Sequence, residues 1–233
     1  MIKKRVLATA LVSFLSINSA FAALSLDATR YIFKGDKAVL SPVVENQSER
    51  DFGAQVWLEN IVEKDTRPTF IATPSFFKVK GKGRQVFRIM KASDHMPKDK
   101  ESIYWLNLQE IPPKKKGSGI AMAIRTKVKM IYRPEAIVKD RRGAEKNLTV
   151  SYLPGERWLE NTTPYIFAID SVTDSKGKKI KFNKKDVKAL TMFMPGDRVN
   201  VTGYTVKSVN AVGDYGALKN YVLKQYSDKH KSK

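Results

Sequence analysis

The amino-acid sequence predicts an all-β protein made of two small antiparallel sandwich domains. Three observations lead to this class. Many short runs alternate apolar with polar residues, or are rich in β-branched and aromatic residues, as strands are. Turn-like clusters separate these runs at spacings of roughly 8 to 12 residues, which is typical of a sandwich. No long amphipathic helix pattern competes with them.

The first half of the chain contains clear examples of predicted strands and turns. Four runs predict strands: Val39–Val44, Ala54–Leu58, Phe87–Ile89 and Ile103–Leu108. Polar or glycine-containing clusters between these runs predict the turns, at residues 34–37, 45–51 and 80–83. This part of the chain therefore fits one antiparallel sandwich.

A polar interruption divides the chain in two. A length of 233 residues fits either one large domain or two small ones. From Pro134 to about Lys146 the chain is polar and charged, and the alternating pattern resumes after it. We therefore place the boundary between residues 142 and 143. Residues 165–169 and 199–201 predict strands of a second β domain, and the basic tail is expected to fray.

The first 22 residues fit an export signal. Lys3, Lys4 and Arg5 precede an apolar stretch, and the sequence up to Ala22 fits a small-x-small cleavage site. The apolar stretch is shorter than the roughly 20 residues that a membrane-spanning helix needs. We expect cleavage after Ala22 and an exported protein that is not inserted in a membrane.

The composition is strongly basic and lacks cysteine. The formal net charge is +20, which raises encounter rates with nucleic acid, anionic lipid or acidic proteins without choosing among them. Export argues against nucleic acid as a partner, while a merely solubilising surface and an acidic protein partner both stay open. The absence of cysteine excludes a disulfide scaffold, so the fold must depend on hydrophobic burial.

Few residues are available for catalysis or metal binding. The two histidines are His95 and His230, and without cysteine they form no zinc-type cluster. A serine hydrolase would have to use His95, and no Gly-x-Ser-x-Gly turn is present. Gly81 and Gly83 lack the spacing of a phosphate or dinucleotide loop. We therefore expect a protein that is not an enzyme and that binds no metal or cofactor.

Several motifs resemble those of the periplasmic pilus chaperones, the PapD-like family. Residues 23–33 resemble the first strand of that family, a short alternating strand that ends in Thr-Arg. Residues 100–113 and 126–134 resemble its two core motifs. The likeness continues at residues 160–165 and 214–216, so it covers essentially the whole chain after the export signal.

This resemblance implies both a fold and a function. Family members have two immunoglobulin-like β-sandwich domains in an L-shaped arrangement. Here these would be residues 23–142, with the donor strand and a short hinge, and residues 143–233, with the basic tail. In the periplasm such chaperones bind pilus subunits and complete their fold by donor-strand complementation. They thereby prevent premature polymerisation, and they deliver the subunits to an outer-membrane usher.

The resemblance also implies a carboxylate-binding pair. In the family, an arginine and a lysine in the interdomain cleft bind the C-terminal carboxylate of a subunit, and motif position assigns these roles to Arg30 and Lys129. An arginine fork can meet both carboxylate oxygens, and a lysine adds a compact charge. Because the chain has 43 basic residues, charge alone would select neither residue.

The donor strand implied by the resemblance contains Ile120, Met122 and Ile124. Alternate residues of a strand share one face, so these side chains would enter the open groove of a subunit. Without the family likeness, the same pattern more often belongs to buried core. Lys129 has the opposite parity, so a common orientation would need a bulge or twist. An exposed apolar edge also favours capping or self-association through it.

Three charged residues match family positions that form an interdomain ion network: Glu101, Arg133 and Asp214. Such a network would set the angle between the domains more than it would add stability, because desolvation offsets much of the attraction. Separately, the Thr73-Pro74 bond lies where the family often has a cis proline followed by a second proline. Here Ser75 follows, so the sequence leaves the isomer open.

Two other functions remain as alternatives. A structural or adhesion module with the same fold would not need Arg30 and Lys129 together, and its 120–124 strand would be protected in the free protein. A hydrolase would show turnover that depends on His95. The sequence names neither the pilus system nor the subunits or the usher.

Overall fold

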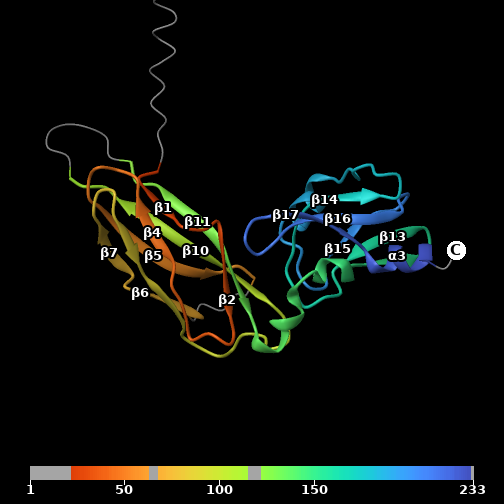
Figure 1. Cartoon of the computed structure of the whole chain (residues 1–233), viewed down its shortest axis with the longest axis horizontal. Coiled ribbons are helices and arrows are strands. Elements are labelled where there is room, and N and C mark those ends of the chain that lie inside the picture. Colours follow the sequence, from red (N-terminus) through yellow and green to blue (C-terminus); the bar gives the residue numbers. More distant parts are fainter. Residues whose placement is uncertain (1–21, 63–67, 115–121, 232–233) are drawn as a thin grey trace, which may run out of the picture.

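The computed structural model describes residues 22–62, 68–114 and 122–231, with side chains described up to Ser227 in the last helix. Strands dominate, and they form two lobes that meet at an angle (Figure 1). The predicted all-β class with two immunoglobulin-like domains is confirmed. No helix in these ranges is long and apolar enough to cross a membrane.

The N-terminal lobe contains one five-stranded sheet and two three-stranded sheets. The five-stranded sheet has the order β2 (Arg30–Lys34), β11 (Arg125–Arg133), β10 (Ser102–Ile111), β5 (Phe52–Asn60) and β7 (Phe76–Val79). The first small sheet has the order β1 (Leu24–Leu26), β4 (Val43–Asn46) and β8 (Arg84–Val86). The second has the order β3 (Val39–Leu40), β9 (Arg88–Lys91) and β6 (Phe70–Thr73).

Period-two alternation places one face of each long strand in the core of the N-terminal lobe. Among the even-numbered side chains of β10 and β11, Leu106, Leu108 and Met130 are fully buried there, and Val128 is partly buried against the same core. Burying one large apolar side chain contributes about 1.5–3 kcal/mol. The odd-numbered side chains of the same strands lie on the opposite face of the sheet. The packed core therefore fixes the strands that carry the polar groups described below.

The C-terminal lobe is built of two three-stranded sheets. One has the order β12 (Thr149–Leu153), β13 (Glu156–Glu160) and β15 (Arg198–Asn200). The other has the order β14 (Ala168–Asp174), β16 (Val206–Val212) and β17 (Leu218–Val222). Their buried side chains, among them Phe167 and Phe193, form a second hydrophobic core.

Two α-helices accompany the C-terminal lobe. Helix α2 (Lys184–Leu190) begins after Asn183, whose side chain accepts a hydrogen bond from the Asp186 amide and so caps the helix. Helix α3 (Lys224–Lys231) occupies most of the tail that the sequence predicted to fray. Tyr226 packs against the second core and fixes the start of the helix. That the tail from Ser227 to Lys233 frays stays a prediction.

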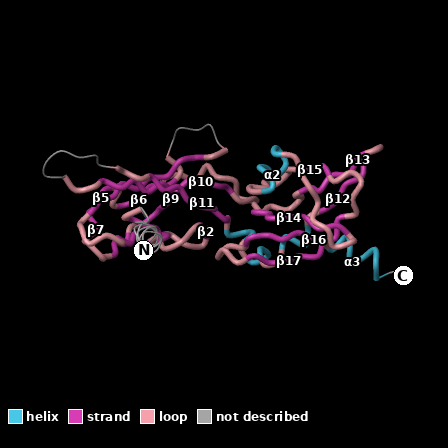
Figure 2. The backbone as a smooth tube through the Cα atoms, turned by 90° about the horizontal axis from the view of Figure 1, so that it is seen from above, coloured by secondary structure: helices cyan, strands magenta, loops and turns pink. Residues whose placement is uncertain are grey.

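Short 3-10 helices connect the two lobes, and Figure 2 shows helical turns between them. They are η2 (Glu135–Ile137), η3 (Lys139–Arg141) and η4 (Ala144–Asn147). The first core extends to Tyr132, and the second begins at Ala144. The predicted boundary between residues 142 and 143 falls within this connection. The Thr73-Pro74 bond, which the sequence left open, is cis.

Candidate functional site

Arg30 and Lys129 lie side by side in the five-stranded sheet. Arg30 begins β2 and Lys129 lies in the middle of β11, and the parallel pairing of these strands makes the two residues register partners. Residues directly opposite in neighbouring strands project to the same face. The structure therefore brings together the two cations that the family resemblance selected.

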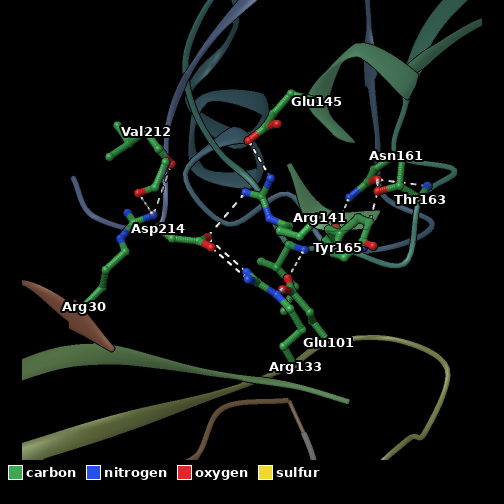
Figure 3. Close-up of polar contacts among 12 residues, drawn as sticks. Arg30, Glu101, Arg133, Arg141, Glu145, Asn161, Thr163, Tyr165, Val212 and Asp214 are labelled. Atoms are coloured by element: carbon green, nitrogen blue, oxygen red, sulfur yellow. Dashed lines mark hydrogen bonds and ion pairs between the residues drawn. The ribbon is translucent and has the colours of Figure 1, made fainter. Parts of the chain in front are cut away.

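Both cations face the C-terminal lobe. Nη1 of Arg30 donates to the carbonyl oxygens of Val212 at 3.2 Å and Gly213 at 3.3 Å (Figure 3). Nζ of Lys129 donates to the carbonyl oxygen of Thr191 at 2.8 Å. These three acceptors are neutral, so each cation keeps its full formal charge at the junction between the lobes.

A small pocket lies between the two lobes beside these cations. Arg30 and Lys129 line it together with apolar side chains from both lobes. Ile103 and Ile131 come from the N-terminal lobe and Ile166 from the C-terminal lobe, and these three form a separate buried cluster. The pocket thus combines two cations with an apolar wall, and its volume of about 10 Å³ is that of about one water molecule.

Burial and mutual repulsion act on the two cations. Burial lowers the pKa of Arg30, while the charge of Asp214 opposes that shift. Burial also lowers the pKa of Lys129, and the positive charge of Arg30 lowers it further. A bound anion would relieve the repulsion between them and replace part of the hydration that they lack.

Glu101, Arg133 and Asp214 form a continuous network across the hinge. Nε of Arg133 donates to Glu101 Oε1 at 2.6 Å, and its two terminal nitrogens donate to Asp214 at 2.8 and 3.0 Å (Figure 3). The second carboxylate oxygen of Glu101 accepts from the Ile166 amide at 2.6 Å. The structure therefore joins all three residues. That the network sets the domain angle stays a prediction.

The sequence reasoning missed two members of this network, Arg141 and Glu145. Arg141 Nη1 lies 2.9 Å from Glu145 Oε1, and its Nη2 lies 3.6 Å from Asp214 Oδ1. The guanidinium also lies over the rings of Tyr165 and Phe167. The one sequence signal was the spacing of four between Arg141 and Glu145, which fits an ion pair on one helix face. In a charged connection, that spacing did not distinguish a buried pair from a solvated one.

The environment of the network shifts the pKa values of its two carboxyl groups, Asp214 and Glu101, in opposite directions. Burial alone would raise the pKa of Asp214, but the hydrogen bonds and charge of Arg133 hold it below its ordinary value. Burial raises the pKa of Glu101, although Arg133 and the Ile166 amide oppose the shift. Asp214 is therefore the more firmly ionised of the two acids that grip Arg133.

The predicted donor segment differs from its expected form. The structure starts β11 at Arg125, so Met122 and Ile124 do not belong to a strand, and Ile120 lies outside the described residues. The Ile124 carbonyl accepts from the Glu110 amide at 2.9 Å, near the end of β10. The Met122 side chain is 73% exposed, so it does not belong to the buried core.

Lys129 and the donor segment lie on opposite faces of the strand. The pairing of β10 with β11 runs without a register shift from Tyr132 to Arg125. No bulge turns Lys129 toward the donor segment, so Lys129 and Ile124 belong to opposite faces of one continuous path. Two separate surfaces are thus available: a carboxylate pocket on one face, and an apolar edge that continues the core face.

His95 has a structural environment in the N-terminal lobe. Its Nδ1 lies 2.5 Å from Ser93 Oγ, and its Nε2 lies 3.2 Å from Thr69 Oγ1. A serine-histidine-aspartate site would instead place a carboxylate at the second ring nitrogen. Among the described residues, no group of three or more potential ligands could hold a metal ion.

Comparison with known proteins identifies close relatives along the chain. The family described as "Pili and flagellar-assembly chaperone, PapD N-terminal domain" matches residues 23–138. Chaperone protein FaeE of Escherichia coli is 54% identical over 221 residues, which are 94% of this chain and 85% of that protein. Chaperone protein ClpE of Escherichia coli is 53% identical over 223 residues, which are 95% of this chain and 84% of that protein.

Solved structures share the same architecture. The periplasmic chaperone SfaE superimposes with a TM-score of 0.66 at 27% identity, covering 85% of this chain and 97% of that one. A chain from the structure of the Salmonella enterica SafA pilin in complex with the SafB chaperone also gives a TM-score of 0.66. It covers 88% of this chain and 98% of that one, and at 22% identity it shows the fold alone.

Proposed function

The chain belongs to the PapD-like family of pilus chaperones, and we propose that it binds pilus subunits in the periplasm and completes their fold by donor-strand complementation. It prevents their premature polymerisation and delivers them to an outer-membrane usher. No nucleotide is required, because a neighbouring subunit's strand replaces the chaperone's strand at release. The observation that carries this proposal is the register pairing of Arg30 with Lys129 at the interdomain pocket.

The carboxylate anchor follows from the contacts of these two cations. Their acceptors are the neutral carbonyl oxygens of Val212, Gly213 and Thr191. A hydrogen bond between ionised partners is roughly twice as strong as one between neutral groups. The C-terminal carboxylate of a subunit therefore competes with these carbonyls for Arg30 and Lys129. Capture of the subunit exchanges internal contacts for charge-assisted ones.

The donor edge supplies the second contact. Beyond the Ile124 carbonyl, the chain has no described partner strand, and the Met122 side chain projects into solvent. Strand addition obtains affinity from main-chain hydrogen bonds and specificity from alternate side chains that fill pockets. Met122 and Ile124, with Ile120 before them in the sequence, fill successive pockets of a subunit's groove. In the free protein, the same edge favours self-association.

The parts of the chain divide the work. Residues 1–22 direct export and are removed after Ala22. Residues 23–142 hold the donor segment and both anchoring cations, and residues 143–233 form the opposite wall of the pocket and end in the basic tail. The protein acts without catalysis, cofactor or metal, and nucleic acid is not a partner.

Subunit capture in the periplasm tests this function. The tagged protein would be coexpressed with candidate pilus subunits of the same genome, and the copurifying subunit measured. We expect Arg30→Ala and Lys129→Ala to reduce recovery at least about ten-fold, since each loses a charge-assisted contact. Lys127→Ala is the matched control on the same face of β11, where Lys127 pairs with Glu59 instead. It should retain normal recovery.

Folding is checked separately by far-ultraviolet circular dichroism and thermal unfolding of each variant. If folded Arg30→Ala and Lys129→Ala proteins recover subunits as well as the wild type does, the carboxylate anchor is wrong. If the wild type recovers no subunit from any tested pilus system, a structural or adhesion module becomes the better interpretation of the fold.

A further inference from the structure

The hinge contains a second cavity, separate from the pocket at Arg30 and Lys129. Its volume is about 350 Å³. Six basic side chains line it, and Arg133 and Arg141 are two of them. The other four come from three parts of the chain: Lys34 at the end of β2, Lys139 and Arg142 in the connection, and Lys219 in β17. Residues from both lobes thus meet around one basic cavity.

The cavity keeps an excess of positive charge. Its two acidic residues, Asp214 and Glu145, are already paired with Arg133 and Arg141. By contrast, within the described ranges none of the other four cations, Lys34, Lys139, Arg142 and Lys219, makes a side-chain hydrogen bond or ion pair. Like charges gathered around a concave surface repel one another and attract a counter-ion.

The backbone holds the cavity's wall in place. Lys34 is the register partner of Arg133, and the next residue, Gly35, donates its amide hydrogen to the Arg133 carbonyl at 2.7 Å. A Cβ atom at Gly35 would lie 2.6 Å from the Glu135 nitrogen, so the turn approaches the connection more closely than any side chain allows. Lys34 is therefore fixed against the connection that carries Lys139.

Arg141 adds a buried donor to this wall. It is 8% exposed, and its Nε has no hydrogen-bond acceptor among the residues that the structure describes. Its terminal nitrogens serve Glu145 and Asp214. The cavity therefore combines the cations of Lys34, Lys139, Arg142 and Lys219 with the buried guanidinium of Arg141.

We propose that this hinge cavity is an anion site that binds a phosphate-bearing ligand. A phosphate group carries up to two charges and presents oxygens in several directions, which suits cations that converge from different sides. A lone planar carboxylate would suit one arginine fork better. Because Lys34 belongs to the N-terminal lobe and Lys219 to the C-terminal lobe, the bound anion bridges the two lobes and restrains the hinge.

Titration of the purified exported protein with pyrophosphate, at constant ionic strength, tests the site. Binding would be followed by calorimetry and by amide shifts in nuclear magnetic resonance spectra. We expect saturable binding, and an affinity at least about ten-fold lower for Lys139→Ala/Arg142→Ala, since two charged donors are removed. Lys178→Ala/Lys179→Ala, which removes two exposed lysines from a turn of the C-terminal lobe, is the control and should bind as the wild type does.

A second arm identifies the source of the phosphate. Vesicles of phosphatidylglycerol, compared with vesicles of phosphatidylcholine, test a lipid headgroup. Saturable pyrophosphate binding supports a free phosphate ligand, and Lys139/Arg142-dependent binding to phosphatidylglycerol alone supports the lipid. Absence of both, or an equal loss in the lysine-turn control, overturns the site. Subunit capture is measured independently, so this outcome leaves the chaperone proposal unaffected.

Discussion

At the scale of single residues, burial decides what a charge does. The side chain of Arg133 is 3% exposed and that of Glu101 is fully buried, whereas Lys78 and Asp51 form a pair that is largely in water. Exposed pairs contribute about 0–1 kcal/mol, but removing one partner of a buried pair leaves an uncompensated charge. Removal of a basic residue therefore lowers stability much more when its ion pair is buried than when the pair is exposed.

We expect Arg133→Met to lower the free energy of unfolding by about 3 kcal/mol, because it leaves the buried Glu101 carboxylate without its cation. Urea denaturation followed by circular dichroism would measure the loss. Lys78→Met removes a lysine from an exposed ion pair and should change stability by less than about 0.5 kcal/mol. Equal losses in the two variants would contradict the role assigned to burial.

Glu59 makes the stability of the sheet depend on pH. Its hydrogen bond from Lys127 and the neighbouring charge of Arg125 lower its pKa to about 2, from an ordinary value of 4.5. A carboxyl whose pKa is depressed by folding stabilises the fold above its unfolded value. That stabilisation is lost as the pH falls from 4.5 toward 2.

The variant Glu59→Gln should accordingly be less stable than the wild type at pH 7, and the difference should shrink as the pH approaches 2. Urea midpoints at pH 7, 4 and 2.5 would measure it. The gap is expected to be small, because Glu59 is partly solvated and water screens its ion pairs. If the stability difference between wild type and Glu59→Gln grew as the pH fell, ionised Glu59 would not be what stabilises the fold.

At the scale of elements, the segment that precedes β11 carries an exposed apolar side chain. Met122 can be exchanged at little cost to the fold, because its side chain is mostly in water. We expect Met122→Asp to retain the wild-type thermal midpoint and to reduce subunit capture, since a charge would enter an apolar groove. Thr126→Asp, on the same face but inside the paired part of β11, should instead lower the thermal midpoint.

Helix α3 protects an edge of the C-terminal lobe. Strand β12 lies at the edge of its sheet, and the Gln225 side chain bonds to both backbone groups of Val150. Its Oε1 accepts from the Val150 amide at 2.7 Å, and its Nε2 donates to the Val150 carbonyl at 3.0 Å. The amide thus takes the place of a neighbouring strand's peptide group and blocks edge pairing there.

Replacing Gln225 with alanine should lower the free energy of unfolding by about 1–2 kcal/mol, because two backbone groups lose their partners. It should also increase self-association, measured by light scattering after size-exclusion chromatography. Lys224→Ala changes the preceding, exposed residue of the same helix and should do neither. Unchanged stability and mass in Gln225→Ala would show that the amide does not protect the edge.

At the scale of the whole molecule, the hinge joins the lobes through backbone as well as side-chain contacts. The Glu101 amide donates to the Pro164 carbonyl at 2.9 Å, beside the bond from the Ile166 amide to the Glu101 side chain. Arg133 and Asp214 close the other side. Glu101 thus attaches the lobes from two directions, while Asp214 adds a contact that can be removed alone.

We expect Asp214→Ala to loosen the hinge without unfolding either lobe, since Arg133 keeps its bond to Glu101. Small-angle X-ray scattering should then show a larger radius of gyration and a broader distribution of distances. Asp170→Ala, which removes a carboxylate from an exposed pair on the same lobe, is the control. An unchanged scattering curve for Asp214→Ala would show that the ion network does not set the domain angle.

Some features of the site could be predicted from motifs, and others could not. Motif position selected Arg30, Lys129 and the three network residues, and the structure places each group together. It could not reveal that Arg141 is buried over two aromatic rings, because charged residues in a polar connection are usually solvated. Of the expected donor strand, Ile120 lies outside the described residues, and Met122 and Ile124 precede the first residue of β11.

By itself, the sequence determined the all-β class and its two lobes, because strand periodicity and turn residues are local patterns. Only the tertiary structure decided that Arg30 lies beside Lys129, that Gln225 binds the edge of β12, and that six basic residues line one hinge cavity. These features depend on the register of strands and on the packing of segments far apart in the chain. Hydrophobic burial sets such contacts through the whole fold, so no local pattern encodes them.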